Sequence, residues 1–193
     1  MTERADSEHK GFKDKFFGLR KNKYKQALYN RYLFCNDYII SKIVLDVPCG
    51  TGWGTSLLKG HKQVYGLDIS EEAVYYARSH FPGTFIVGSM TDMPFDENAF
   101  DVIICLEGLE HITFLEGQKF IQEAKRVLKQ GAKLIMTVPL MNNRKHSGNI
   151  YHLCEYYEPE LNDILKKEFE MESYEKVQGT DNPVARCVLI NRK

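Results

Sequence analysis

A carboxylate and three glycines stand close together in residues 44–55, which read VLDVPCGTGWGT. Asp46 lies in an apolar run, and Gly50, Gly52 and Gly54 follow it. Glycines let a ligand approach the backbone closely, and the N–H groups at the start of a following helix can bind an anion. Because the carboxylate can meet an ammonium group, the segment suits a ligand with an amino-acid-like end.

A second acidic residue, Asp68, ends the next apolar run. In folds of this type a carboxylate at that place accepts hydrogen bonds from ribose hydroxyls, which predicts a nucleoside in the same ligand. A helix cap together with Ser70 is the alternative role of Asp68. The glycines also resemble a dinucleotide fingerprint, but Thr55 stands where its third glycine belongs, so a nicotinamide cofactor is the weaker interpretation.

Short apolar runs alternate with helical stretches around these residues, which is the pattern of βαβ units in a mostly parallel sheet. After Pro139 the alternation stops, and two final strands would complete the sheet as an antiparallel pair. Gly131 suits the position just past the third helix. The predicted strands are 43–47, 63–68, 84–87, 100–105, 133–138, 171–176 and 185–190, and the predicted helices are 52–58, 71–79, 114–128 and 158–169.

The chain has 193 residues, the usual size of one domain. We expect a single domain over 1–193, with a helical lead-in or cap over 1–41 and an α/β core over 42–193. Lys plus Arg and Asp plus Glu both total 26, so no global charge favours nucleic acid. The basic and aromatic residues 10–31 could serve RNA locally, or form an ordinary amphipathic helix.

No apolar run is long enough to span a bilayer, and the first residues lack the apolar region of a secretory leader. These features predict a cytoplasmic protein without a membrane partner. Its five cysteines are widely spaced with no C-x-x-C pair, which favours reduced thiols over disulfides or a zinc cluster.

Five segments, 45–54, 64–70, 87–95, 100–112 and 127–139, resemble the successive motifs of class I S-adenosylmethionine-dependent methyltransferases. The resemblance implies a doubly wound α/β fold, with a seven-stranded mostly parallel sheet in the order 3-2-1-4-5-7-6 and helices on both faces. It also implies S-adenosylmethionine as methyl donor and S-adenosylhomocysteine as product. The implied donor-binding residues are Asp46, Gly50, Gly52 and Leu106 around the methionine end, Asp68 at the ribose, and Ile69, Ser89 and Met90 at the adenine.

Glu107, Glu110 and His111 follow the fourth predicted strand. An oxygen acceptor must lose a proton, which makes His111 a candidate general base, with Glu107 as a second catalytic candidate. A divalent metal held by these three residues and His152 is an alternative, in which the segment resembles small-RNA 3′-terminal methyltransferases and ubiquinone-biosynthesis O-methyltransferases. In a third interpretation the segment only orients its loop. We favour a metal-independent enzyme.

Residues 29–34 and 149–156 resemble bacterial methyltransferases of sugar and surface-polysaccharide pathways. With them, the sequence predicts methyl transfer at oxygen to a small-molecule acceptor, and the narrower prediction is a sugar or sugar nucleotide. Residues 105–108 read CLEG instead of the turn expected of enzymes that methylate exocyclic amines. The alternatives are a metal-dependent O-methyltransferase of RNA termini or quinone-type acceptors, and a noncatalytic donor-binding module.

The loop 141–146 follows the fifth predicted strand, whose carboxyl end should face the acceptor. Arg144 and Lys145 in it could select a phosphate-bearing acceptor. A solvated loop without such a role is the alternative interpretation.

Overall fold

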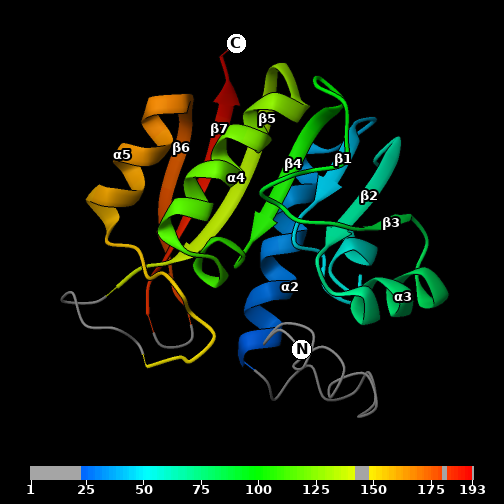
Figure 1. The fold of residues 1–193 in the computed structure, drawn as a ribbon, viewed down its shortest axis with the longest axis horizontal. Coiled ribbons are helices and arrows are strands. Elements are labelled where there is room, and N and C mark those ends of the chain that lie inside the picture. Colours follow the sequence, from blue (N-terminus) through cyan, green and yellow to red (C-terminus); the bar gives the residue numbers. More distant parts are fainter. Residues whose placement is uncertain (1–22, 142–147, 180–181, 193) are drawn as a thin grey trace.

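A single seven-stranded sheet forms the centre of the protein, with the strand order β3-β2-β1-β4-β5-β7-β6 (Figure 1). The computed structural model describes residues 23–141, 148–179 and 182–192. β1, β2, β3, β4 and β5 pair in parallel, and β7 runs antiparallel to both β5 and β6. The predicted fold class and strand order are therefore confirmed. The strands are β1 Ile43–Asp46, β2 Gln63–Asp68, β3 Thr84–Val87, β4 Phe100–Leu106, β5 Leu128–Pro139, β6 Phe169–Val177 and β7 Val184–Asn191.

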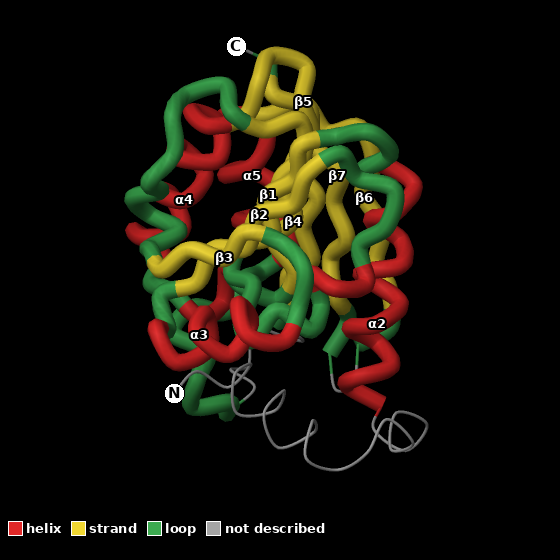
Figure 2. Tube along the Cα trace, turned by 90° about the vertical axis from the view of Figure 1, so that its right-hand side faces the viewer, coloured by secondary structure: helices red, strands yellow, loops and turns green. Residues whose placement is uncertain are grey.

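Helices cover both faces of the sheet. Figure 2 shows α4 and α5 on one face and α2 on the other. The alternation of side chains along β4 explains this arrangement: Ile103 belongs to the buried cluster that contains α4 and α5, whereas Val102 and Ile104 belong to the cluster that contains α2. The helices are α2 Lys23–Cys35, α3 Glu71–His80, α4 Phe114–Val127 and α5 Glu158–Glu168. No helix among the described residues is long and apolar enough to cross a membrane.

The two helices that flank the candidate site begin at side-chain caps. Ser70 accepts a hydrogen bond from the Ala73 N–H and starts α3, as its sequence position predicts. Thr113 and Glu116 form a reciprocal capping box at the start of α4. These caps fix where each helix begins relative to the strand before it.

The helix predicted over 52–58 is wrong. The described structure has only a single 3-10 turn there, Thr55–Leu57, preceded by turns at Gly52 and Gly54. Gly52 has a φ of 79°, which is outside the helical region, and Gly60 ends the segment with a φ of 77°. The glycine turn is therefore not followed by an α-helix N-terminus that could bind an anion as predicted.

Gly131 does not end the third helix as predicted. α4 ends at Val127, and the Leu128 N–H still bonds to the Ala124 carbonyl as the chain turns into β5. Gly131 lies inside β5 with a φ of 73°. There the register against β4 shifts between the pairs Phe100–Leu128 and Val102–Lys133. The glycine therefore allows an irregular backbone within β5 and does not end a helix.

α2 packs onto the sheet through one buried stripe. Leu28, Arg31, Tyr32 and Cys35 are buried and follow the i, i+3, i+4, i+7 spacing of a helix face. Residues 1–22, which hold the rest of the predicted lead-in over 1–41, lie outside the described residues. The described part of the lead-in is thus integral to the core, and the single domain over 1–193 stays a prediction.

Two leucines of α2 offer a matched test of this packing. Leu28 is 1% exposed and Leu33 is 42% exposed. We expect Leu28→Ala to lower the free energy of unfolding by about 2–5 kcal/mol, since it leaves a cavity. Leu33→Ala should change it by about 0.5 kcal/mol, as surface substitutions do. Urea denaturation measures both, and equal losses would contradict the observed face of α2.

Candidate active site

The functional candidates gather at the edge where the parallel strands end, at the bottom of the sheet in Figure 1. β1 lies between β2 and β4 in the sheet. Asp46 ends β1, Asp68 ends β2, and Glu107 follows β4 directly. Carboxyl ends of adjacent parallel strands meet at one edge, so the fold brings these three predicted residues together.

Asp46 is fully buried and bonded to protein groups. Its carboxylate accepts a hydrogen bond of 2.6 Å from the Thr55 hydroxyl and is 3.1 and 3.2 Å from the Tyr32 hydroxyl. These bonds tie the end of β1 to α2 and to the segment after the glycine turn. Asp46 therefore positions the turn from within the core, and its predicted contact with a ligand stays a prediction.

Asp68 links the second strand to the glycine turn. Its Oδ2 accepts a hydrogen bond of 2.7 Å from the Gly50 N–H, and its Oδ1 accepts one of 2.9 Å from the Ser70 N–H. Gly50 has a φ of 55°, a left-handed conformation that glycine adopts without strain. A Cβ at Gly52 would lie 2.8 Å from the Ala77 Cβ, so α3 requires a glycine there. The ribose contact predicted for Asp68 stays a prediction, as do the ligand contacts of both glycines.

The residues predicted to surround adenine follow β2 and β3. Ile69 is 68% exposed, which is unusual for an isoleucine and leaves an apolar surface beside Asp68. Met90 is buried, and the Ser89 hydroxyl lies 2.8 Å from that of Thr91 and accepts the Thr91 N–H. Leu106 is buried at the end of β4, in the cluster that contains α2. Their adenine and methionine contacts stay predictions.

A pair of charged residues on α4 fixes the segment after Met90. Glu123 accepts the Met93 N–H at 2.8 Å, and the Arg126 guanidinium donates to the carbonyls of Met93 and Phe95. The guanidinium also donates to Glu123 and holds the pKa of its carboxyl below the usual value, against the opposite effect of partial burial. The segment is thus anchored to a helix.

The two glutamates of the E-x-x-E-H segment separate in space. Glu107 has a φ of 51° and lies against Arg31 of α2, with 3.4 Å between its Oε2 and the Arg31 Nη1. Glu110 is buried on the other side of Gly108, and its carbonyl accepts the N–H groups of Leu153 and Cys154. Glu107 is not part of the cluster that Glu110 forms. The predicted catalytic role of Glu107 stays a prediction.

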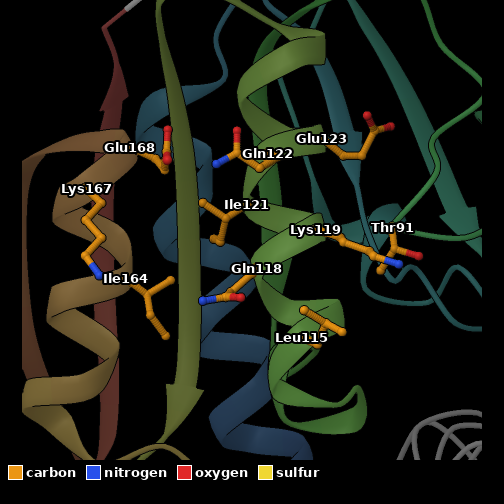
Figure 3. Close-up of a pocket in the computed structure, with 10 residues that line it drawn as sticks. All are labelled: Thr91, Leu115, Gln118, Lys119, Ile121, Gln122, Glu123, Ile164, Lys167 and Glu168. Atoms are coloured by element: carbon orange, nitrogen blue, oxygen red, sulfur yellow. The ribbon is translucent and has the colours of Figure 1, made fainter.

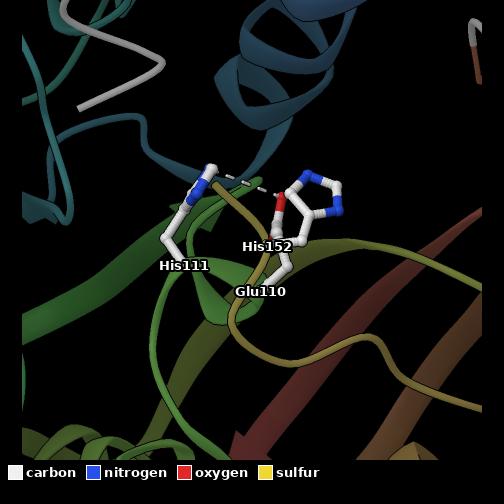
Figure 4. Close-up of side chains that lie close together, drawn as sticks. All are labelled: Glu110, His111 and His152. Carbon is white, nitrogen blue, oxygen red and sulfur yellow. Dashed lines mark ion pairs between the residues drawn. The ribbon is translucent and has the colours of Figure 1, made fainter. Parts of the chain in front are cut away.

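Glu110, His111 and His152 converge, as Figure 4 shows. One potential ligand atom of each lies within 4.8 Å of the others. The His111 Nδ1 lies 3.0 Å from the Tyr151 carbonyl oxygen, and the His152 Nδ1 lies 3.1 Å from the Glu155 Oε1. Since both oxygens are hydrogen-bond acceptors, each Nδ1 is the donor, and in a neutral imidazole the lone pair is then on Nε2. The His111 Nε2 lies 4.0 Å from the Glu110 Oε1. Both imidazoles are therefore set up to take a proton or to bind a metal through Nε2.

The groove in Figure 3 is separate from this edge. It has a volume of about 500 Å³ and lies between α4 and α5. Its lining includes Thr91 but no residue of the glycine turn and neither histidine. We therefore do not place the donor or the reacting atoms in it.

Sequence reasoning did not single out three residues of the site: Arg31, Tyr32 and Thr55. The signal that could have found Arg31 is its place on the apolar stripe of α2, because a charged residue on a buried helix face needs a partner. The sequence draws attention to Thr55 only because it stands where the third glycine of a dinucleotide fingerprint belongs. The loop 141–146, with the predicted phosphate contacts of Arg144 and Lys145, lies almost entirely outside the described residues.

Comparison with known proteins indicates the class of domain. Residues 45–136, which hold the glycine turn, Asp68 and the E-x-x-E-H segment, match the family model of a methyltransferase domain. The solved structure of the PH0226 protein from Pyrococcus horikoshii superposes with a TM-score of 0.76 over 90% of this chain and 93% of that one, at 23% identity. The N-methyltransferase NodS from Bradyrhizobium japonicum, in complex with S-adenosyl-L-homocysteine, superposes with a TM-score of 0.75 over 91% of both chains, at 17% identity.

Sequence relatives include enzymes of different specificity. A demethylmenaquinone methyltransferase of Thermotoga maritima is 34% identical over 56% of this chain and 48% of its own length. The O-methyltransferase cnsE of Penicillium expansum is 30% identical over 61% of this chain and 46% of its own. The chain spans about half the length of these relatives. Residues 45–136, just under half of the chain, are thus similar to methyltransferase domains, and nearly the whole chain shares the fold of the class I S-adenosylmethionine-dependent methyltransferases.

Two aspartates that each accept a backbone N–H allow a test of the donor site. Asp68 binds the Gly50 N–H at the carboxyl edge, and Asp101 binds the Ile43 N–H at the opposite edge. We expect Asp68→Ala to weaken S-adenosylhomocysteine binding by about 1–3 kcal/mol, because the variant loses the carboxylate that holds the turn and that is predicted to accept the ribose hydroxyls. Asp101→Ala should leave this affinity unchanged. Calorimetry measures both, and unchanged binding by folded Asp68→Ala would place the ribose elsewhere.

Proposed function

We propose that the protein transfers the methyl group of S-adenosylmethionine to a hydroxyl oxygen of a small-molecule acceptor. The observation that carries the choice of oxygen is the His111 imidazole, whose Nδ1 contacts the Tyr151 carbonyl, so that Nε2 is the nitrogen that accepts a proton when the ring is neutral. A hydroxyl must lose a proton during transfer, and histidine is the side chain that most often accepts such a proton. The similarity to methyltransferase domains supplies the donor.

The proposed reaction is an in-line displacement. The acceptor oxygen attacks the methyl carbon, the bond between that carbon and the sulfonium sulfur breaks, and S-adenosylhomocysteine leaves. The hydroxyl proton passes to the His111 Nε2. Because the leaving group is part of the donor, holding both substrates in line and excluding water supply much of the acceleration. Asp46, Asp68 and the glycine turn provide the rigid donor side of this arrangement.

A sugar-type acceptor is the narrower form of the proposal. It rests on the sequence of residues 29–34 and 149–156 alone. Structurally, the second segment contributes His152 and the carbonyl that orients His111, so it borders the proposed reacting atoms. The names of the relatives include both N- and O-methyltransferases and do not select among acceptors.

Metal-assisted transfer to oxygen is a second candidate, favoured by the convergence of Glu110, His111 and His152. One carboxylate and two imidazoles suit divalent transition metals. Each imidazole is also oriented by an acceptor on its other nitrogen, a carbonyl for His111 and the Glu155 carboxylate for His152, which is usual for metal-binding histidines. In this candidate a metal would lower the pKa of the acceptor hydroxyl, and His111 would be a ligand instead of a base.

The acceptor can be identified by incubating the protein with labelled donor and metabolite fractions. With that acceptor, His111→Ala should lower turnover by about 10²–10⁴-fold while donor affinity is unchanged, because the variant loses only the base. His61→Ala is the control, since His61 precedes β2 at the opposite edge of the sheet. Donor binding without any methylated product in any fraction would favour a noncatalytic module.

Chelation separates the two candidates. A metal-free mechanism predicts that EDTA leaves turnover unchanged and that His152→Ala has a far smaller effect than His111→Ala. Under the metal mechanism, EDTA abolishes turnover, a divalent ion restores it, and both histidine variants lose it, since each removes a ligand. Metal content of the purified protein, measured by mass spectrometry, provides a readout independent of activity.

A further inference from the structure

The groove in Figure 3 takes no part in the proposed reaction. Its lining comes from α4 and α5, and Thr91 after β3 completes it. The volume of about 500 Å³ is within the range of small-molecule sites in proteins. The side chains of the lining therefore indicate which kind of molecule fits there.

Three apolar side chains line the groove. Ile121 is 1% exposed, and Ile164 is partly buried and packs against the same core cluster. Leu115, in the first turn of α4, is 63% exposed. Covering such a side chain with an apolar group is favourable because it removes apolar surface from water. The groove thus offers a contact to the apolar part of a ligand.

The two carboxylates of the lining are neutralised by cations outside it. The Arg126 guanidinium donates to both carboxylate oxygens of Glu123, at 2.7 and 2.8 Å. The Lys125 ammonium donates to Glu168 at 2.8 Å. Neither Arg126 nor Lys125 lines the groove. These carboxylates therefore do not balance the positive charges that the groove presents to a ligand.

Lys119 and Lys167 give the groove its net charge. Both are exposed, and neither forms an ion pair with another residue of the described parts of the chain. Glu116, one turn before Lys119, bonds instead to the N–H and hydroxyl of Thr113. In Figure 3 Lys167 comes from α5, and Lys119 extends toward Thr91 on the other side. An ammonium group thus flanks the apolar lining on each side.

We propose that this groove binds an amphipathic anion, a small molecule with an apolar body and a carboxylate, sulfonate or phosphate group. The body covers Leu115, Ile121 and Ile164, and the anionic group pairs with Lys119 or Lys167. Both parts are needed. A small anion alone would gain little, because pairs with exposed ammonium groups are weak in water. An uncharged apolar molecule would gain nothing from the lysines.

This site is distinct from the donor edge, although it borders a segment that reaches it. Thr91 in the lining bonds to the Ser89 hydroxyl through its own N–H and hydroxyl. Glu123 in the lining accepts the Met93 N–H. The lining contains no residue of the glycine turn. The ligand is therefore an additional one, and the inference does not depend on the proposed function.

The test uses two fluorescent probes that share an apolar body and differ in charge, anilinonaphthalenesulfonate and uncharged phenylnaphthylamine. Each is titrated into the full chain. The double variant Lys119→Met with Lys167→Met should bind the sulfonate about fivefold more weakly, the upper range for ion pairs in contact with water. It should bind the uncharged probe as wild type does, because methionine retains an apolar stem. Leu115→Ser should weaken the binding of both probes.

Lys62→Met with Lys166→Met is the matched control, because both lysines are exposed, lie outside the lining and change the net charge equally. Leu33→Ser is the control for Leu115→Ser, since Leu33 is exposed on α2. Both controls should bind the two probes as wild type does. Equal affinity of the lysine variant and its control for the sulfonate would overturn the inference. Self-association that Leu115→Ser abolishes, measured by sedimentation, would also overturn it, since a second copy would then fill the groove.

Discussion

The buried carboxylate of Asp46 is the constraint on which the candidate site depends. It ends the central strand β1 with no exposure to solvent, and its partners Tyr32 and Thr55 come from the helix before that strand and from the segment after the glycine turn. A buried carboxylate without partners is costly, so the three segments hold each other in place. Gly54 is part of the same arrangement, because a Cβ there would lie 2.1 Å from the Tyr32 ring.

This central link determines what the neighbouring strands can do. With the end of β1 fixed, the Gly50 N–H of the turn donates a hydrogen bond to Asp68. Asp68 also accepts a hydrogen bond from the N–H of Ser70, the N-cap residue of α3. The donor edge is consequently made of backbone groups whose positions are set by two buried carboxylates. Such rigidity suits a reaction in which the positions of two substrates matter more than any single reactive side chain.

The sequence predicted the sheet and the residues at its edge because their signals are local. Strands β2 and β3 have the predicted bounds, since their apolar runs end at Asp68 and Val87. The prediction of a helix at 52–58 is wrong because Gly52 has a positive φ and lies so close to α3 that a Cβ there would meet Ala77. No local pattern reveals that approach. Likewise, the partner of Arg31 lies 76 positions away in the chain, beyond the reach of any spacing argument.

The proposed acceptor side is built differently from the proposed donor side, and this explains why the sequence leaves the acceptor open. In the proposed function two loops form the acceptor side: residues 107–113 after β4 and residues 148–155 after β5. They are joined by the Glu110 carbonyl, which accepts the N–H groups of Leu153 and Cys154, and by the His111 imidazole on the Tyr151 carbonyl. These are mostly bonds to backbone groups, which many side chains would permit. The choice of acceptor would then depend on the side chains that these loops carry, and residues 148–155 lie beyond the segment that matches the family model. Ile150 and Leu153 are largely exposed there, next to two imidazoles. An acceptor with an apolar part beside its reacting hydroxyl would cover both kinds of surface at once, and burial of those side chains would exclude water from the transferred methyl group.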